Sequence, residues 1–320
     1  MAEAGENISG WIKEQAKNAG FNLVGIAPVE VSVRRDYIRE WFAAGRAGTM
    51  QWMHRHLDAK VDVRKYMPEA RSIICVAINY HFPLTSPPDA KARGRIARYA
   101  LGDDYHEVFR QRLHKLADVV RNRLPGEITK CCCDTSPVLE REYAQAAGIG
   151  WIGKNTCVIH PRMGSWLLLG EVLVSAELPF DEPTGEHCGT CRRCIDACPT
   201  RAIIAPYQLD PTKCISYLNI EYRDTLDEKQ RRALGDWLFG CDICQEVCPY
   251  NRESPEGVVK EFRPRMVDGA VELDEIIELN EDTFREKFRN SAVRRVKLPV
   301  LQANANAVSE NRRESRSIQG

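Results

Sequence analysis

Eight of the thirteen cysteines lie between residues 188 and 248, at spacings that iron–sulfur clusters use. The first set reads Cys188-x2-Cys191-x2-Cys194-x3-Cys198-Pro199, the run by which bacterial-type ferredoxins hold their clusters. Three closely spaced thiolates wrap one 4Fe–4S cluster, and the fourth cysteine, set further on and followed by proline, reaches a second cluster. The run therefore predicts a second set of cysteines elsewhere in the chain.

That second set follows as Cys241-x2-Cys244-x3-Cys248-Pro249, and Cys214 is the thiol left over in this region. We assign cluster one to Cys188, Cys191, Cys194 and Cys248, and cluster two to Cys198, Cys214, Cys241 and Cys244. Two structural zinc sites are the alternative, since Cys-x2-Cys pairs also bind zinc. The doubled spacing and both Cys-Pro dipeptides favour two clusters, which predict electron transfer.

Asp134 is the candidate acid. It ends an expected strand over residues 128–133 and precedes Thr135-Ser136-Pro137, and the strand ends of α/β sheets are where ligands bind. A carboxyl group half-buried beside an apolar ligand has a raised pKa and can donate a proton near neutral pH. The structural alternative is that Asp134 caps a helix that begins near Pro137.

Three other patterns receive structural interpretations. Residues 148–154 match G-x-G-x-x-G and nearly match a P-loop, but a helix pattern precedes them where a nucleotide site needs a strand. The cysteines at 131–133 alternate between the two faces of a strand and cannot share one metal. His54 and His56 have no third ligand nearby, so surface positions are expected.

Helix and strand patterns alternate through the first 180 residues and indicate an α/β fold. The expected helices cover residues 9–18, 104–124 and 139–147, and the expected strands cover 21–26, 72–80, 128–133 and 166–174. A Pro- and Gly-rich stretch at 178–185 marks the first boundary. We therefore expect three regions: 1–180, an α/β domain; 181–258, a two-cluster domain; and 259–320, a helical and basic segment.

Composition narrows the class of protein. The 320 residues carry 45 basic and 45 acidic side chains, are 43% hydrophobic and 28% charged, and are typical of a globular protein. No export signal and no run of ~18 apolar residues is seen, which predicts a cytoplasmic protein with no membrane partner. In such a chain, many cysteines indicate metal or redox chemistry rather than disulfides.

Several motifs together resemble those of the epoxyqueuosine reductases. They are Arg98-Tyr-Ala-Leu-Gly-Asp-Asp-Tyr-His106, Asp134-Thr-Ser-Pro-Val-Leu-Glu-Arg141, the stretch 147–156, Gly164-Ser-Trp166 with Leu169-Gly-Glu171, and Cys214-Ile-Ser-Tyr-Leu218, with both cysteine sets in the same order. The resemblance covers roughly residues 10–300. It implies a nitroreductase-like α/β domain that binds cobalamin, fused to a ferredoxin-like domain with two 4Fe–4S clusters and a short helical C-terminus.

The resemblance also implies site residues. Asp134 would be the proton donor and would contact the corrin, and Ser216 and Arg223 would contact transfer RNA. The further corrin contacts that it implies are Leu57, Ala97, Arg98, Lys154, Asn155, Thr156, Val158, Ser165 and Leu169.

The implied reaction is a two-electron, two-proton reduction of the epoxide of epoxyqueuosine to the cyclopentene of queuosine, at the wobble position of the tRNAs for Tyr, His, Asp and Asn. An external low-potential donor of the flavodoxin or ferredoxin type would supply the electrons. Two alternatives stay open: a reductive-dehalogenase-like corrinoid enzyme acting on a small molecule, and a non-enzymatic two-cluster electron-transfer protein.

The net charge of zero gives the chain as a whole no excess of basic residues for binding RNA. Residues 289–320 nevertheless hold seven Lys/Arg against two Asp/Glu. Residues 291–297 and 301–308 resemble the start of the helical-repeat domain of longer family members.

Overall fold

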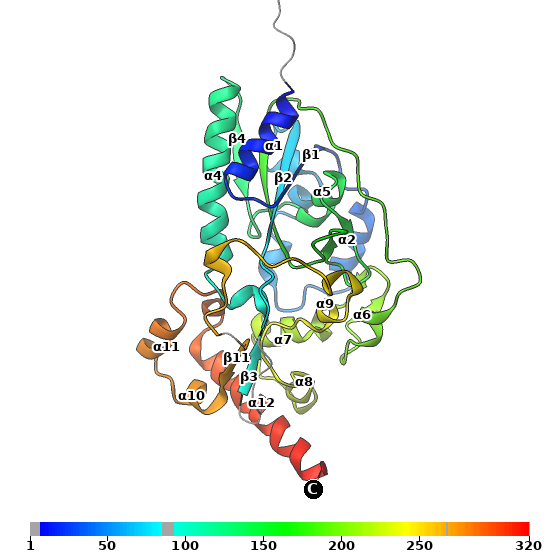
Figure 1. The fold of residues 1–320 in the computed structure, drawn as a ribbon. Helices are drawn as coiled ribbons and strands as arrows, with labels where there is room; N and C mark the ends of the chain where they lie inside the picture. The colour runs from blue at the N-terminus through cyan, green and yellow to red at the C-terminus, as the bar shows by residue number, and fades with distance from the viewer. Residues whose placement is uncertain (1–6, 85–92, 267, 320) are drawn as a thin grey trace, which may run out of the picture.

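A four-stranded antiparallel sheet forms the centre of the N-terminal half (Figure 1). The computed structural model describes residues 7–84, 93–266 and 268–319. The strands lie in the order β1 (Leu23–Pro28), β2 (Ser72–Asn79), β7 (Leu167–Val174) and β4 (Thr129–Cys132). Ser72 at the start of β2 pairs with Pro28 on one side and Val174 on the other.

Strand β2 is buried along its whole length because helices cover both faces of the sheet. Ile74, Val76 and Ile78 pack under α1 (Ile8–Asn18) and α4 (Tyr105–Arg123). Ile73 and Cys75 point the opposite way, toward α5 (Glu140–Ala146). A strand of β-branched residues with no polar face suits this double burial.

Helix α4 fixes one wall of the future site. It begins at the N-cap Asp104, whose carboxylate accepts a hydrogen bond from the His106 amide, and it ends just before Pro125-Gly126. Its apolar side chains recur at helical spacing and pack on the sheet. The first turn, which carries His106, therefore stands at one end of the sheet.

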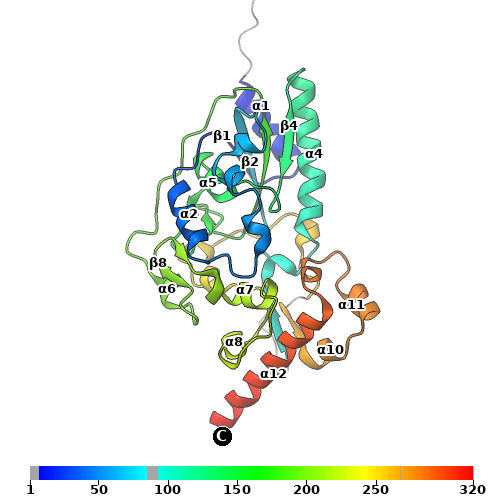
Figure 2. The ribbon, with the colours of Figure 1, turned by 180° about the vertical axis from the view of Figure 1, so that it is seen from behind.

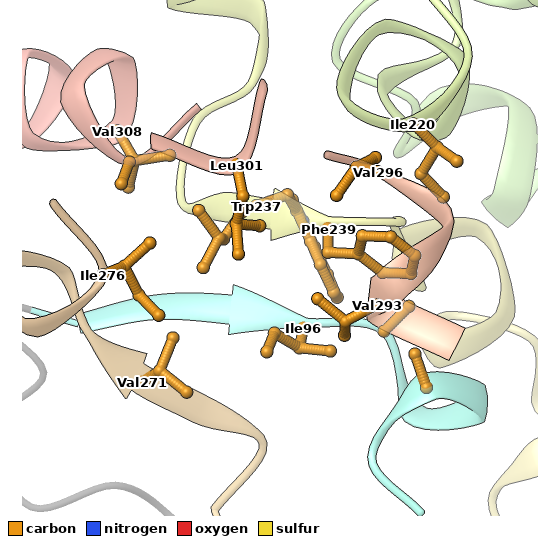
Figure 3. Close-up of a cluster of buried hydrophobic side chains, with 14 of the residues drawn as sticks. Ile96, Ile220, Trp237, Phe239, Val271, Ile276, Val293, Val296, Leu301 and Val308 are labelled. Atoms are coloured by element: carbon orange, nitrogen blue, oxygen red, sulfur yellow. The ribbon is translucent and has the colours of Figure 1, made fainter. Parts of the chain in front are cut away.

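A second core lies around a three-stranded sheet of β10 (Trp237–Phe239), β3 (Arg93–Ile96) and β11 (Ala270–Glu272). Strand β3 pairs in parallel with β10 and antiparallel with β11. Figure 3 shows Phe239, Val271 and Leu301 converging from separate segments on this sheet. Each of the three regions expected from the sequence thus contributes one strand to this sheet: 1–180, 181–258 and 259–320. The boundaries between these regions remain a prediction.

The C-terminal helix α12 (Leu298–Gln319) belongs to this second core. Leu301, Ala305 and Val308 are buried, and the helix packs on α10 (Leu273–Glu278), β10, α8 (Glu228–Ala233) and α7 (Ile215–Ile220). The helical character expected for the C-terminal segment is present. Its apolar residues are used here to close the core.

The cysteine-rich loops lie between the two cores. They contain the short helices α6 (Arg193–Asp196) and α9 (Ile243–Glu246), which contact each other, and the hairpin of β8 (Ile203–Ala205) and β9 (Gln208–Leu209). A second small hairpin pairs β5 (Trp151–Ile152) with β6 (Val158–Ile159). The remaining helices are α2 (Arg35–Ala43), α3 (Leu57–Val61) and α11 (Glu281–Lys287).

None of the helices in the described part of the chain has both the length and the apolar character that a membrane crossing requires.

Candidate active site

An open cleft of about 450 Å³ lies between α2, the start of α5 and the β8–β9 hairpin. Figure 2 shows α2 above this hairpin, and the Trp41 indole donates to the Leu209 carbonyl at 3.4 Å. Aromatic and apolar side chains form much of its wall, among them Trp41, Phe42, Trp52 and Met53. Lys60, Asp134, Glu140 and Thr156 add polar groups. An apolar cleft with a few convergent polar groups is typical of a ligand site, and the volume of this one falls within the ~300–1,000 Å³ of most small-molecule pockets.

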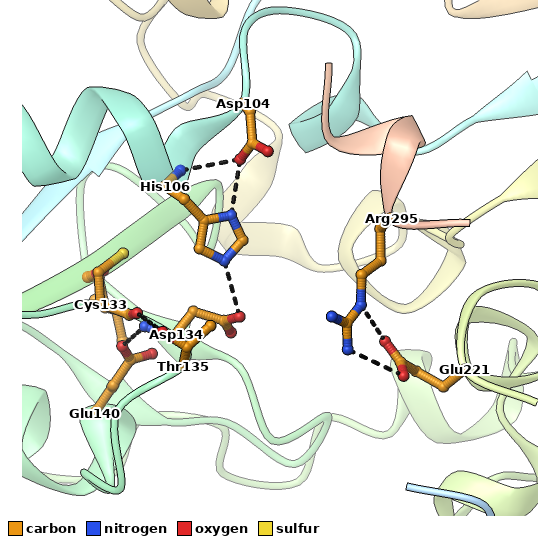
Figure 4. A network of polar contacts seen from close by, with 9 residues as sticks. Asp104, His106, Cys133, Asp134, Thr135, Glu140, Glu221 and Arg295 are labelled. Carbon is orange, nitrogen blue, oxygen red and sulfur yellow. Dashed lines mark hydrogen bonds and ion pairs between the residues drawn. The ribbon is translucent and has the colours of Figure 1, made fainter. Parts of the chain in front are cut away.

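Asp134 lines this cleft at the end of β4. Its backbone has a φ of 52°, a left-handed conformation that is uncommon outside glycine, and its amide donates to the Glu140 carboxylate. Its own carboxylate accepts a hydrogen bond from His106 Nε2 at 3.1 Å (Figure 4). The helix-capping alternative is wrong, because α5 has Leu139 at its N-cap and no side-chain cap bond.

His106 bridges two carboxylates, since its Nδ1 also lies 2.7 Å from Asp104 Oδ1. The hydrogen bond to Asp104, followed by the one to Asp134, raises the pKa of His106 to about 9. The Tyr105 ring stacks on the imidazole at 4.1 Å between centroids. At neutral pH this imidazole is therefore protonated and donates from both nitrogens.

The pKa of Asp134 is lowered, although burial alone raises it, because the charged His106 hydrogen-bonds its carboxylate. The raised pKa that we expect from burial beside an apolar ligand is thus not what the protein alone shows. An ionised Asp134 next to a protonated His106 holds one transferable proton within the pair.

Two further carboxyl groups, those of Glu140 and Glu171, lie near the end of β4 that Asp134 follows. Burial, and then the neighbouring charge of Asp134, raise the pKa of Glu140 to about 7. Glu171 of β7 is fully buried, pairs across the sheet with Cys75 and Cys132, and neither of its oxygens has a partner among the described residues. Burial, and then the charge of Glu140, raise the pKa of Glu171 well above its usual range, which favours its neutral form.

The four cysteines assigned to cluster one surround one small cavity. Cys188, Cys191, Cys194 and Cys248 all line it, together with Lys154 and Tyr250. Thiols that converge on one space from two distant segments are the donor set that a 4Fe–4S cluster requires. Among the described residues, no three His, Cys, Asp or Glu side chains lie as close together as the ligands of a single metal ion.

The four cysteines assigned to cluster two also lie together. Burial raises the pKa of the Cys241 thiol to about 12, and nearby Cys214 and Cys198 add to the effect. Cys244 interacts with both Cys214 and Cys241. A fifth thiol, Cys157, shares a hydrogen bond with Cys244, and the sequence patterns did not single it out.

The residues that the family resemblance implies as corrin contacts are spread over three places. Thr156 lines the cleft, whereas Leu57, Val158 and Leu169, on α3, β6 and β7, are not among its lining residues. Lys154 and Asn155 instead face the cluster loops: Asn155 Nδ2 donates to the Cys244 carbonyl at 3.4 Å.

The other three implied contacts lie where the two cores meet. Ala97 is buried beside Phe239, to whose carbonyl its amide donates at 2.8 Å. The Arg98 amide donates to Asp242 at 2.8 Å, and the buried Ser165 hydroxyl accepts from Asn251.

The two implied RNA contacts lie near the start and the end of α7. Ser216 is half-buried two residues after Cys214, and Arg223 is exposed just beyond the helix. Glu221 between them pairs with Arg295 at 3.0 Å, as Figure 4 shows. Arg295 also lies over the Trp52 ring, 5.8 Å from its centroid, so these residues border the cleft.

The remaining cysteines and histidines keep the structural places expected of them. Cys132 is buried on the α5 face, whereas Cys131 and Cys133 pack against the α4 side. His54 and His56 are exposed.

Sequence reasoning missed Lys60 and Glu140 as members of the cleft, and His106 as the partner of Asp134. His106 and Glu140 belong to the motifs 98–106 and 134–141, so a search for polar groups near the acid could have found them. Lys60 stands in α3 beside other charged residues, and no local spacing distinguishes it.

Comparison with known proteins follows the same division of the chain. Residues 187–251 match the family described as "4Fe-4S double cluster binding domain", which favours clusters over zinc. Residues 60–135 match "Epoxyqueuosine reductase QueG, DUF1730".

Whole-chain relatives agree. An epoxyqueuosine reductase of Xanthomonas campestris is 40% identical over 89% of this chain and 81% of the relative. One of Gloeobacter violaceus is 40% identical over 92% of this chain and 93% of the relative. A crystal structure of epoxyqueuosine reductase with an epoxyqueuosine-modified tRNA-Tyr stem loop superposes with a TM-score of 0.89 at 28% identity, covering 98% of this chain and 83% of that one.

Proposed function

The chain belongs to the epoxyqueuosine reductase family, and we propose how its own residues perform the reduction that defines the family. It is an oxidoreductase that reduces the epoxide of epoxyqueuosine to queuosine, with cobalamin and two 4Fe–4S clusters as cofactors. The net reaction takes up two electrons and two protons, breaks both C–O bonds of the epoxide and releases the oxygen as water. The alternatives of a small-molecule dehalogenase and of a non-enzymatic electron carrier are not favoured.

The residues present fit these cofactors. Four thiols around one cavity and four more beside it suit two clusters, held by the two cysteine sets assigned above. The open apolar cleft suits a corrin, with Trp41, Phe42 and Thr156 in its wall. Cobalamin supplies a low-potential, carbon-directed reductant that no side chain can provide.

The His106–Asp134 pair is the observation that carries the catalytic assignment. We assign proton donation to the Asp134 carboxyl, recharged from the His106 imidazolium 3.1 Å away. Asp104 holds the opposite ring nitrogen and orients the imidazole. The Glu140 carboxylate holds the Asp134 amide and so fixes the loop that aims the acid into the cleft.

The two clusters, held by the two cysteine sets, would supply one-electron transfer between an external donor and the cleft. The loop around cluster one carries exposed residues at 189, 190, 192 and 193. The cysteines assigned to cluster two come near the cleft: Cys157, whose thiol hydrogen-bonds that of Cys244, follows the cleft residue Thr156, and Cys214 comes soon after the cleft residue Pro211. The donor would be a low-potential protein of the flavodoxin or ferredoxin type.

Transfer RNA is the substrate carrier, and we propose the tRNAs for Tyr, His, Asp and Asn. Ser216 and Arg223 would contact it at the border of the cleft, and the basic C-terminal segment would add phosphate contacts. Because the net charge is zero, we expect the rest of the protein surface to contribute little to tRNA affinity. The proposed location is the cytoplasm, where modified tRNA is used.

The deciding experiment is anaerobic reconstitution with iron, sulfide and cobalamin, followed by reduction with epoxyqueuosine-containing tRNA and nucleoside mass spectrometry. We expect loss of one oxygen from the modified nucleoside, dependent on cobalamin. Protein that binds cobalamin but leaves the nucleoside unchanged would contradict the substrate. If the protein binds no cobalamin, the result would favour the alternative of a non-enzymatic electron carrier.

A further inference from the structure

Lys154 places a buried positive charge at the cavity of cluster one. Its side chain belongs to a residue that is only 9% exposed, and it lines the cavity together with Cys188, Cys191 and Cys194. The ammonium donates to the carbonyl of Gly189 and, at 3.0 Å, to the carbonyl of Cys191. The charge therefore lies inside the loop that carries the first two thiols.

This ammonium has no anionic partner in the part of the chain that the structure describes, where only backbone carbonyls accept from it. Burying an ammonium without a counter-charge is costly, and two neutral carbonyls offset that cost only in part. Four thiolate ligands around the cavity would supply the missing negative charge. One-electron reduction of the cluster would add more, so the ammonium stabilises the reduced form more than the oxidised form.

The turn that carries Lys154 is held by hydrogen bonds on both sides, which fixes the point from which the lysine side chain enters the cluster loop. The Lys154 carbonyl accepts from the Tyr207 amide at 3.2 Å, and the next residue, Asn155, donates to the Cys244 carbonyl. At Gly153 an added Cβ would lie 2.4 Å from the Ile159 side chain, which leaves the turn little room to move. The glycine-rich stretch that resembles a P-loop thus carries its lysine to a cluster loop instead of a nucleotide.

We propose that Lys154 is the counter-cation of cluster one and raises the reduction potential of that cluster. The inference rests on the proposed ligand set Cys188, Cys191, Cys194 and Cys248. It makes Lys154 a tuning residue for electron transfer. Cluster charge, hydrogen bonds and exposure are the variables that set cluster potentials, and the lysine changes the local charge.

The test is an anaerobic redox titration of the reconstituted protein by electron paramagnetic resonance, with Lys154→Gln, Lys154→Arg and the wild type. Glutamine keeps a donor for the loop carbonyls and removes the charge, whereas arginine keeps the charge. We expect the ratio of reduced to oxidised cluster one, measured at the wild-type midpoint, to fall about tenfold in Lys154→Gln, about 59 mV for a one-electron couple. In Lys154→Arg the ratio should stay within about threefold. The redox transition that disappears in Cys191→Ser is assigned to cluster one. Lys229→Gln, on the exposed face of α8, is the matched control.

Each outcome decides the question. Loaded Lys154→Gln with an unchanged potential, or an equal shift in the arginine variant, would overturn the proposal, because the charge would then have no effect. If iron analysis shows that the glutamine variant loses cluster one while the arginine variant keeps it, the charge is needed and the proposal stands. Loss of the cluster in both variants would make Lys154 a structural pin only. These readouts need no substrate, so they stay separate from a failure of the proposed function.

Discussion

At the scale of single residues, one imidazole controls the acid chemistry of the cleft. His106 lies between Asp104 and Asp134 and donates a hydrogen bond to each carboxylate. A carboxylate with a lowered pKa is a poor acid alone, so the useful proton belongs to the pair.

Removing the carboxylate should therefore stop the reaction. In Asp134→Asn we expect turnover to fall by about 10²–10⁴-fold, the usual contribution of a general acid. Iron and cobalamin content should stay unchanged, since Asp134 is not a cluster ligand. Nucleoside mass spectrometry measures the loss, and Asp118→Asn on the outer face of α4 is the control. Retained activity would refute the role of Asp134.

The same network predicts a pH-dependent contribution to stability. The folded-state pKa of His106 is raised to about 9 against an ordinary value of 6.5. Its stabilisation is thus complete below about pH 6.5 and is lost as the pH rises through 9. The gain is on the order of 1 kcal/mol or less, because the side chains of His106 and Asp134 are more than one third exposed. The melting temperatures of wild type and His106→Gln should converge between pH 6.5 and 9.5, and a constant gap would contradict this.

Five thiols compete for the four ligand positions of cluster two. We expect Cys214→Ser to lose one cluster, seen as a halved iron content, and to keep the other. Cys157→Ser should keep both clusters, since Cys157 is a neighbour of Cys244 and stands outside the x2/x3 pattern. The reverse result would make Cys157 the ligand in place of Cys214.

At the scale of elements, the cofactor sites are assembled from short turns that side-chain amides hold together. Asn251, just after Cys248, accepts from the Ser165 amide and donates to the Ser165 hydroxyl. Gln245 of α9 donates to the Ser165 carbonyl at 2.9 Å. The loops of the clusters are thereby fixed to the start of β7.

Gly164 is a position in this assembly where no side chain larger than hydrogen fits. Its φ is +64°, and an added Cβ would lie 1.9 Å from the Asn251 amide oxygen. We expect Gly164→Ala to lower the free energy of unfolding by more than the ~1–3 kcal/mol of a strained backbone alone, because Asn251 must also move. Gly126→Ala has a similar backbone at φ +91° with nothing nearby and should cost less. Urea unfolding of both variants compares them, and equal losses would contradict the clash.

Sequence patterns located the long elements well and the short ones poorly. The helices at 8–18 and 105–123 and the strand at 72–79 carry clear periodicity or a continuous apolar run, and their expected positions are confirmed. Strands β3, β10 and β11 have three or four residues each and pair with segments far away in the chain, so no local signal marks them. Asp134 could be found because it ends a strand. The pairing of His106 with Asp134, and of Lys154 with the carbonyls of a cluster loop, depends on contacts that only the folded chain creates.

At the scale of the whole molecule, the cysteine-rich region is not an appended unit. Asp242 accepts from the Arg98 amide, Gln245 holds Ser165, and β10 pairs with β3. We therefore expect cluster bleaching, followed by visible absorbance, to coincide with the loss of backbone circular dichroism in urea. Two separate transitions would show that residues 181–258 fold and unfold on their own.

The placement of β3 also sets a timetable for biosynthesis. The first sheet is complete once β7 has been made at residue 174, whereas β3 has no partner until β10 and β11 are synthesised, the latter about 100 residues later. At ~5–20 residues per second this is a delay of roughly 5–20 s on the ribosome. During it the N-terminal half can fold while the cysteines at 188–198 wait for Cys241, Cys244 and Cys248. Iron and sulfide must then be delivered to a chain in which Cys248 has already been made, with one half already folded and both sets of thiols still open.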